Sequence, residues 1–206
     1  SQTQCRNSMA LTLTSVITAS KKTYSEGYQY YSLGEKSFSG MIDPILNLEH
    51  FRMTEATFPP HPYAGYSSVT YLFETSPGRF RSRDSLGSDI SLNPGELQWT
   101  MAGKGIMHEE VPLKEGVAVE GLKVLVNLSK SSKKREPVVF HLALNDVPQW
   151  SPSAAISVNV LTGRLSGVES PLRIPDPFSF FDVKIKARMG FRARVLKDSG
   201  ALIYVV

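Results

Sequence analysis

Short apolar or alternating runs, separated by glycine, proline, asparagine and aspartate, recur along this chain and limit it to one class of fold. Residues 67–74 (SSVTYLFE) and 121–128 (GLKVLVNL) are rich in β-branched and aromatic side chains, which favour strands. Turn-forming residues follow such runs at the spacing of β-structure, and helical periodicity is hard to find anywhere. The sequence therefore predicts an all-β protein.

Further strands are expected in both parts of the chain. In the first part we expect them at residues 27–33, 41–53, 79–84, 90–92, 97–101 and 138–144. In the last part we expect them at residues 155–161, 171–177, 178–187 and 193–196, ahead of an apolar run at 201–206. Residues 11–19 (LTLTSVITA) alternate and are threonine-rich, so we expect a strand or a disordered arm there rather than the core of a signal peptide.

A change in composition at residues 145–152 (NDVPQWSP) predicts a domain boundary. We divide the chain into a flexible N-terminal segment at 1–14, a β domain at 15–148 and a second β domain at 149–206. The second domain looks truncated, because it is too short to close a barrel of its own. We therefore expect it to pack against the first domain.

Composition limits the cellular compartments and the classes of binding partner that we expect for this protein. Cys5 is the single cysteine, so this sequence forms no internal disulfide and no cysteine-based zinc site, which fits a reducing compartment. The net charge of +4 is small, and the basic run at 130–135 (KSSKKR) is typical of a solvated loop, so nucleic acid binding is not indicated. No run approaches the roughly 18 apolar residues of a membrane helix. We expect a soluble, cytoplasmic protein without membrane association.

Residues 93–112 (NPGELQWTMAGKGIMHEEVP) contain the first candidate functional residues. Pro94 and Gly95 occupy the positions that a type II turn prefers, ahead of a short strand. Side chains two apart on a strand point to the same face, so His108 and Glu110 are expected on one wall. Taken alone, this pattern equally describes a solvated polar strand end.

A second stretch, residues 59–66 (PPHPYAGY), also contains metal-ligand-type side chains and favours a metal site over a solvated strand end. Pro60 and Pro62 hold the residues before them in extended conformations, so His61 and Tyr63 are expected to share a face. Two short extended segments that each present ligand-type side chains on one face are what a metal site inside a small β-barrel requires. The two stretches together predict such a site.

A set of motifs in a fixed order then resembles the pirin family of the cupin superfamily. The motifs are His61-Pro62-x-x-Gly65-Tyr66, Val69-Thr70-Tyr71-Leu72, Asp84-Ser85-Leu86-Gly87, Pro94-Gly95-x-x-Gln98-Trp99, Ala102-Gly103-x-Gly105-Ile106-x-His108-x-Glu110-x-Pro112 and Gly121-Leu122-x-x-x-Val126-Asn127-Leu128. The likeness covers residues 15–150 well, and residues 151–206 resemble the start of the pirin C-terminal domain. Each motif is weak alone, whereas the ordered set is specific.

The resemblance implies an all-β fold with a cupin barrel (double-stranded β-helix, or jelly roll) at 15–148 and a partial second cupin-like domain at 149–206. It also implies one divalent metal, most often iron, in the N-terminal barrel. Pirins hold this metal with three histidines and a glutamate, the first two histidines in an HPH motif. Carried over, the ligands are His61, His108 and Glu110, with Tyr63 at the second histidine of HPH and Ala64 where the family commonly has arginine.

The resemblance also implies two classes of function. Family members include quercetin 2,3-dioxygenases, so this chain is expected to act as an iron-dependent dioxygenase of flavonol-type substrates, with Glu110 as both ligand and catalytic base. The family also includes a nuclear transcriptional co-regulator that acts as an iron-dependent switch. The alternative is therefore a non-enzymatic regulatory or protein-binding module with a degenerate or weak metal site. A small aromatic substrate and a protein partner correspond to these two hypotheses.

Tyr63 leaves three outcomes open for the metal site. His61, His108 and Glu110 alone have the composition of the 2-His-1-carboxylate triad that supports Fe(II) with open positions. Alternatively, Tyr63 completes the site as a phenolate, or the site loses its affinity for metal and becomes a hydrogen-bonded polar cluster.

Four more aromatic or imidazole side chains complete the set of candidates. Phe58, Tyr66 and Trp99 are candidates for the pocket wall, although each also suits an ordinary core. His141 lies alone within a strand, and we expect it to be structural.

Overall fold

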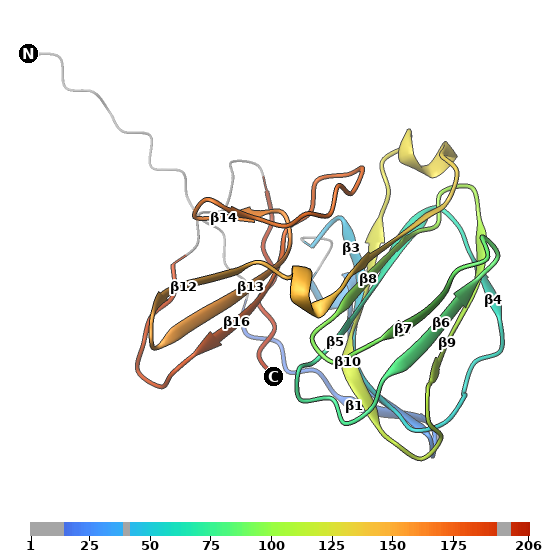
Figure 1. Cartoon of the computed structure of the whole chain (residues 1–206), viewed down its shortest axis with the longest axis horizontal. Helices are drawn as coiled ribbons and strands as arrows, with labels where there is room; N and C mark the ends of the chain where they lie inside the picture. Colours follow the sequence, from blue (N-terminus) through green and yellow to red (C-terminus); the bar gives the residue numbers. More distant parts are fainter. Residues whose placement is uncertain (1–14, 39–41, 193–198) are drawn as a thin grey trace, which may run out of the picture.

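The computed structural model describes residues 15–38, 42–192 and 199–206, and its regular structure is almost entirely β (Figure 1). The strands are β1 (Lys21–Ser25), β2 (Tyr28–Gly34), β3 (Ile45–Met53), β4 (His61–Tyr63), β5 (Tyr66–Leu72), β6 (Phe80–Asp84), β7 (Asp89–Leu92), β8 (Leu97–Met101), β9 (Ile106–Pro112), β10 (Val119–Asn127), β11 (Val138–Leu142), β12 (Gln149–Ser153), β13 (Ile156–Thr162), β14 (Arg164–Leu165), β15 (Val168–Glu169) and β16 (Phe180–Ile185). Three 3-10 turns are η1 (Glu35–Phe38), η2 (Ser132–Lys134) and η3 (Leu144–Asp146). The predicted all-β class is confirmed.

Two antiparallel sheets enclose the first part of the molecule. The larger has the order β1-β2-β3-β10-β5-β8-β11, and the smaller has the order β4-β9-β6-β7. They lie face to face (Figure 1), and side chains bond across the gap, as where Gln98 Nε2 donates to Ser82 Oγ at 2.7 Å. We call the space between the sheets the barrel interior. This arrangement confirms the cupin-like fold.

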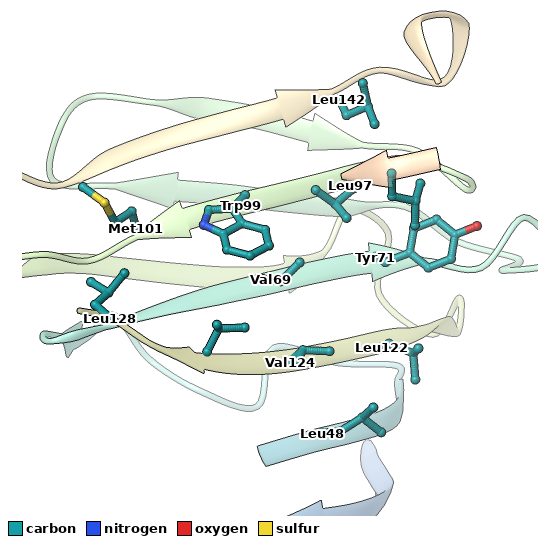
Figure 2. Packing of buried hydrophobic residues seen from close by; sticks show 12 residues of the cluster. Leu48, Val69, Tyr71, Leu97, Trp99, Met101, Leu122, Val124, Leu128 and Leu142 are labelled. Carbon is teal, nitrogen blue, oxygen red and sulfur yellow. The ribbon is translucent and has the colours of Figure 1, made fainter. Parts of the chain in front are cut away.

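Strand alternation gives the large sheet two different faces. In register across neighbouring strands, one row consists of Leu48, Val124, Val69, Trp99 and Phe140. The adjacent row consists of Glu49, Lys123, Thr70 and Gln98. The first row belongs to the outer apolar face, drawn in Figure 2 with its neighbours Leu97, Met101 and Leu122. The second belongs to the inner polar face, which lines the barrel interior.

The C-terminal part of the chain covers the outer apolar face. Its strands form a separate sheet, β12-β13-β16, and a small hairpin, β14-β15. Leu161, Phe178 and Phe180 pack on the outer face, and the Tyr71 hydroxyl donates to Asp182 Oδ2 at 2.7 Å. The domain division at residue 148 stays a prediction; the change of sheet falls between β11 and β12, beside it.

One of the predicted strands is wrong. Residues 171–177 form no strand, because Pro171, Pro175 and Pro177 lack the N–H donors that a ladder needs. The apolar run at 201–206 packs Leu202 and Tyr204 onto the core through their side chains. The strand predicted at 193–196 and the segment 1–14 lie outside the described residues. The sequence reading missed β1, β12, β14 and β15.

Among the described residues, every helix is a short 3-10 turn, and none has the length or apolar character to cross a bilayer.

Candidate functional site

The pairing of β4 with β9 brings the two predicted ligand stretches together. His61 lies directly opposite His108 in this antiparallel pair, so both side chains point to the same face. Their ring centroids are 4.6 Å apart. Gly103 permits the tight bend before β9, because its φ is 51° and a Cβ there would lie 2.2 Å from the Arg135 carbonyl oxygen. Gly103 therefore helps to place β9, and with it His108, opposite β4.

Tyr63 and Glu110 extend the same wall. Tyr63 is two residues beyond His61 on β4, and its ring centroid lies 4.0 Å from that of His108. Glu110 is two residues beyond His108 on β9 and is 7% exposed. The structure thus gathers all four predicted ligand residues on one side of the barrel interior.

His61 is oriented by the backbone just before it. Its Nδ1 lies 2.9 Å from the Pro59 carbonyl oxygen, which can only accept, so Nδ1 carries the proton and donates. The other ring nitrogen, Nε2, then keeps its lone pair. This contact is of the kind that orients histidines in binding sites.

His108 is the most isolated polar group of the site. It is 3% exposed, and both of its ring nitrogens lack a hydrogen-bond partner in the described structure. Burial lowers the pKa of His108 to about 4, so the ring is neutral at neutral pH. Buried polar atoms without partners are rare, and they mark places where a water, an ion or a ligand binds.

Glu110 is engaged by two side chains from the large sheet. Thr70 Oγ1 donates to Glu110 Oε1 at 2.7 Å, and the Lys123 ammonium donates to Oε2. The side chains of Lys123 and Glu110 are only 19% and 6% exposed. Burial alone raises the pKa of Glu110, but Lys123 outweighs it and holds that pKa below its ordinary value. Burial lowers the pKa of Lys123, and Glu110 outweighs it in turn, so both groups are charged.

A cavity of about 180 Å³ lies against this pair. Its aromatic or apolar lining residues are Tyr28, Phe51, Met53, Phe58 and Phe80. Its polar ones are Glu49, which accepts from the Tyr28 hydroxyl, and His61, Tyr63, Glu110 and Lys123, which we call the polar end. Phe58 lines the cavity as predicted, whereas Trp99 lies on the outer apolar face and Tyr66 packs on Tyr63 with ring centroids 5.0 Å apart. A larger hollow, of about 560 Å³, lies between β11 and the Ser170–Arg173 region and includes none of the predicted ligands.

Lys123 is the functional residue that the sequence reading missed. It belongs to a strand whose apolar side chains, Leu122 and Val124, point the other way. A lysine alternating with buried leucine and valine was the available signal, because such a strand is covered on both faces. His141, by contrast, is placed as expected: its Nε2 lies 2.9 Å from Glu96 Oε2, outside the cavity.

The arrangement does not fit a resident metal ion while Lys123 holds Glu110. Within the described residues, no group of three or more His, Cys, Asp or Glu side chains has the geometry to hold one. A dication about 4 Å from an ammonium would be repelled by about 8 kcal/mol at an effective dielectric constant of about 20. The unpartnered nitrogens of His108 favour a bound group, but the charge of Lys123 opposes a metal.

Comparison with known proteins gives one family and several relatives. The family model described as Pirin matches residues 21–126. Pirin from Rattus norvegicus is 33% identical over 167 residues, which cover 81% of this chain and 56% of that protein. The chain thus spans little more than half the length of such relatives.

Solved structures agree on the fold. The crystal structure of GK1651 from Geobacillus kaustophilus has a TM-score of 0.75 and 29% identity, covering 82% of this chain and 66% of that one. Quercetin 2,3-dioxygenase from Acinetobacter baumannii has a TM-score of 0.69 and 20% identity over 80% of this chain and 60% of its own. Bacterial pirin YhhW from Escherichia coli, solved in complex with nickel(II), has a TM-score of 0.55 and 14% identity, covering 72% and 71%. The last two likenesses concern the fold alone.

Proposed function

This chain belongs to the pirin family, and we propose that its barrel interior binds a small hydroxylated aromatic molecule without a resident metal ion. The observation that carries the proposal is the cavity itself, which has an aromatic wall and a polar end closed by the Lys123–Glu110 pair. The proposal corresponds to the non-enzymatic alternative, a pirin-like module with a degenerate metal site.

The walls of the cavity suit a single aromatic ring. The rings of Phe51 and Phe80 stack with centroids 5.3 Å apart, and Phe58 meets Tyr28 edge-on at 5.1 Å, so aromatic faces and edges surround the space. Its volume of about 180 Å³ is below the roughly 300 Å³ at which pockets for drug-sized ligands begin. A one-ring compound therefore matches this space better than a three-ring flavonol.

The polar end suits a hydroxyl group. His61 Nε2 offers an acceptor for the hydroxyl proton, and the Lys123 ammonium has further N–H donors beyond the one on Glu110. Lys123 and Glu110 neutralise each other, and Glu49 adds a second carboxylate to the cavity lining. A neutral phenol or catechol is consequently favoured over a carboxylate.

The experiment is calorimetric titration of chelator-treated protein with catechol, with benzene as the apolar probe. Catechol is expected to bind at least about 10-fold more tightly than benzene, a difference of about 1.4 kcal/mol. His61→Phe should remove most of that preference, whereas His50→Phe, outside the cavity, should keep it. Binding that appears only after metal is added, or no binding at all, would reject the proposal.

Metal-dependent dioxygenation is the second candidate function. The specific support for it is His108, whose two buried nitrogens lack partners, together with the free Nε2 of His61. In this hypothesis His61, Tyr63, His108 and Glu110 hold iron, Glu110 also serves as the base, and a flavonol is the substrate. The nickel(II) in the YhhW complex is consistent with a metal in a related barrel, and the fold shared with quercetin 2,3-dioxygenase is consistent with the proposed reaction.

Metal analysis of protein purified without chelator, followed by oxygen uptake with quercetin, separates the two candidates. Iron near one per chain, with turnover lost in His108→Ala, would favour the dioxygenase. No turnover after anaerobic iron loading would leave the metal-free module. The protein partner and the cytoplasmic location stay predictions.

A further inference from the structure

We infer that Lys123 takes the place of a metal cation in this barrel, and that replacing Lys123 opens a latent metal site. The inference rests on the proposed function, in which the barrel works without a resident metal ion.

The ammonium lies among the predicted ligands. Lys123 enters the barrel interior from β10 of the large sheet, and Glu110 enters from β9 of the small sheet. The ammonium donates to Glu110 Oε2 and lies 5.9 Å from the centroid of the Tyr63 ring. His61 lines the same cavity. The ammonium of Lys123 therefore lies beside the wall that carries the four predicted ligand residues.

Charge balance favours the lysine over a dication. Lys123 pairs directly with Glu110, while Glu49, the other carboxylate of the cavity lining, accepts from the Tyr28 hydroxyl and from Asn47 Nδ2. One ammonium neutralises the Glu110 carboxylate. A divalent ion held by Glu110, His61 and His108 would add two positive charges beside the ammonium of Lys123.

Tyr63 and Lys123 form a matched pair of departures from a metal site. An ammonium within about 6 Å of an aromatic centroid is attracted by the ring face. The Lys123 ammonium lies 5.9 Å from the Tyr63 ring centroid, and the Tyr63 hydroxyl is a second acceptor for it beside Glu110. The two residues come from strands β4 and β10, far apart in the chain, yet each suits the presence of the other.

The remaining donors explain why the metal site is latent rather than lost. Within the described residues, the His61 ring is held through Nδ1, both nitrogens of His108 are unpartnered, and Glu110 is already held by Thr70 through Oε1. Removing the ammonium releases Oε2 and leaves two imidazoles and a carboxylate, the donor set of a 2-His-1-carboxylate triad. Tyr63→His would add a fourth donor on the same wall.

The test measures Co²⁺ and Ni²⁺ binding by calorimetry and by the visible spectrum of Co²⁺. We expect Lys123→Gln with Tyr63→His to bind at least about 100-fold more tightly than the native chain, and Lys123→Gln alone about 10-fold more tightly. Tyr63→His alone should gain little, because the ammonium stays in place. Adding Glu110→Gln to the double variant should abolish the gain.

Two control variants keep the inference open to rejection. Lys123→Arg keeps the positive charge and should not gain metal affinity, and Lys104→Gln changes an exposed lysine that pairs with Glu136. If the calorimetric variants fold poorly, added Ni²⁺ should still raise the unfolding temperature of the double variant and not that of the native chain.

Tight binding of one metal by the native chain, or a double variant no tighter than Lys104→Gln, would overturn the inference. The proposed function is tested separately, because catechol binding is measured on the native chain without metal. If the double variant binds metal and the native chain does not bind catechol, the proposed aromatic ligand is wrong but the inference about Lys123 is supported.

Discussion

On β8 the two faces of the large sheet are equally buried but held by different forces. On β8, Trp99 of the outer apolar face is 2% exposed, and Gln98 of the inner polar face is also 2% exposed. Trp99 packs on Phe178 from the C-terminal part, with ring centroids 5.5 Å apart. Gln98 instead depends on polar partners, donating to Ser82 and Thr100. Burial alone therefore does not distinguish a core from a site.

The difference lies in which side chains build each face, because both faces contain buried atoms without a partner in the described structure. These atoms are Ser68 Oγ, Gln98 Oε1 and both nitrogens of His108 on the inner side, and Ser67 Oγ and Trp99 Nε1 on the outer side. Each such group lowers stability unless a water or a ligand satisfies it. The outer apolar face packs as a hydrophobic core, whereas the inner polar face is the one to which we assign ligand binding.

The largest expected effect is on the outer apolar face. Trp99→Ala should lower the free energy of unfolding by about 3–5 kcal/mol, because a fully packed indole is replaced by a cavity. Urea unfolding followed by circular dichroism measures it, with the exposed Leu86→Ala as the control. A loss below about 1 kcal/mol would mean that the C-terminal part does not pack as described.

On the inner polar face, Lys123→Met should lower the free energy of unfolding by about 2–4 kcal/mol, because it leaves Glu110 buried and unpaired. The double change Lys123→Met with Glu110→Leu should recover stability to within about 1 kcal/mol of the native chain. Urea unfolding of the three proteins at one pH gives the comparison. If the single and double variants lost the same free energy of unfolding, the unpaired charge of Glu110 would not be the cause of the loss.

The turn that sets which side chains of β8 face inward depends on Glu96. Its oxygens accept from the Asn93 and Leu144 backbone N–H groups, from Asn93 Nδ2 and from His141. Glu96→Gln should lower the free energy of unfolding at pH 7 by about 1–2 kcal/mol, because the amide accepts fewer of these bonds. Urea unfolding measures this effect.

The same carboxylate should make stability depend on pH. Burial alone raises the pKa of Glu96, but hydrogen bonds from Asn93, His141 and Leu144 outweigh it and hold the pKa below its ordinary value. Its stabilising contribution is then present above the ordinary glutamate pKa of about 4.3 and lost as the pH falls through the lower folded value. Unfolding curves between pH 6 and pH 3 should fall less steeply for Glu96→Gln than for the native chain. Parallel curves would contradict this assignment.

The smallest effect is expected outside both faces. Lys104→Met removes an ion pair with Glu136 in which the side chains are 59% and 78% exposed. Solvent screens such a pair, so the free energy of unfolding should change by no more than about 0.5 kcal/mol. Comparing Lys104→Met with Lys123→Met in the same urea titration shows how much burial adds to the stability that one lysine–glutamate pair contributes. A similar loss in both variants would remove the distinction between the inner face and the surface.

Much of the fold follows from local patterns. Alternation and turn residues locate most strands, and the ordered motifs identify the family, because both depend on residues close together in the chain. The prediction failed at residues 171–177, where Leu172 and Ile174 pack through their side chains without a partner strand. Strand formation needs a partner, and a local pattern does not provide one.

The site divides in the same way. The sequence by itself places His61 with Tyr63 and His108 with Glu110, since each pair sits two apart on a short extended segment. Only the tertiary structure brings Lys123 to Glu110, because the packing of one sheet on the other depends on contacts distant in the chain. The C-terminal part also decides the orientation of β10: by covering Leu122 and Val124 it leaves Lys123 to face the barrel interior.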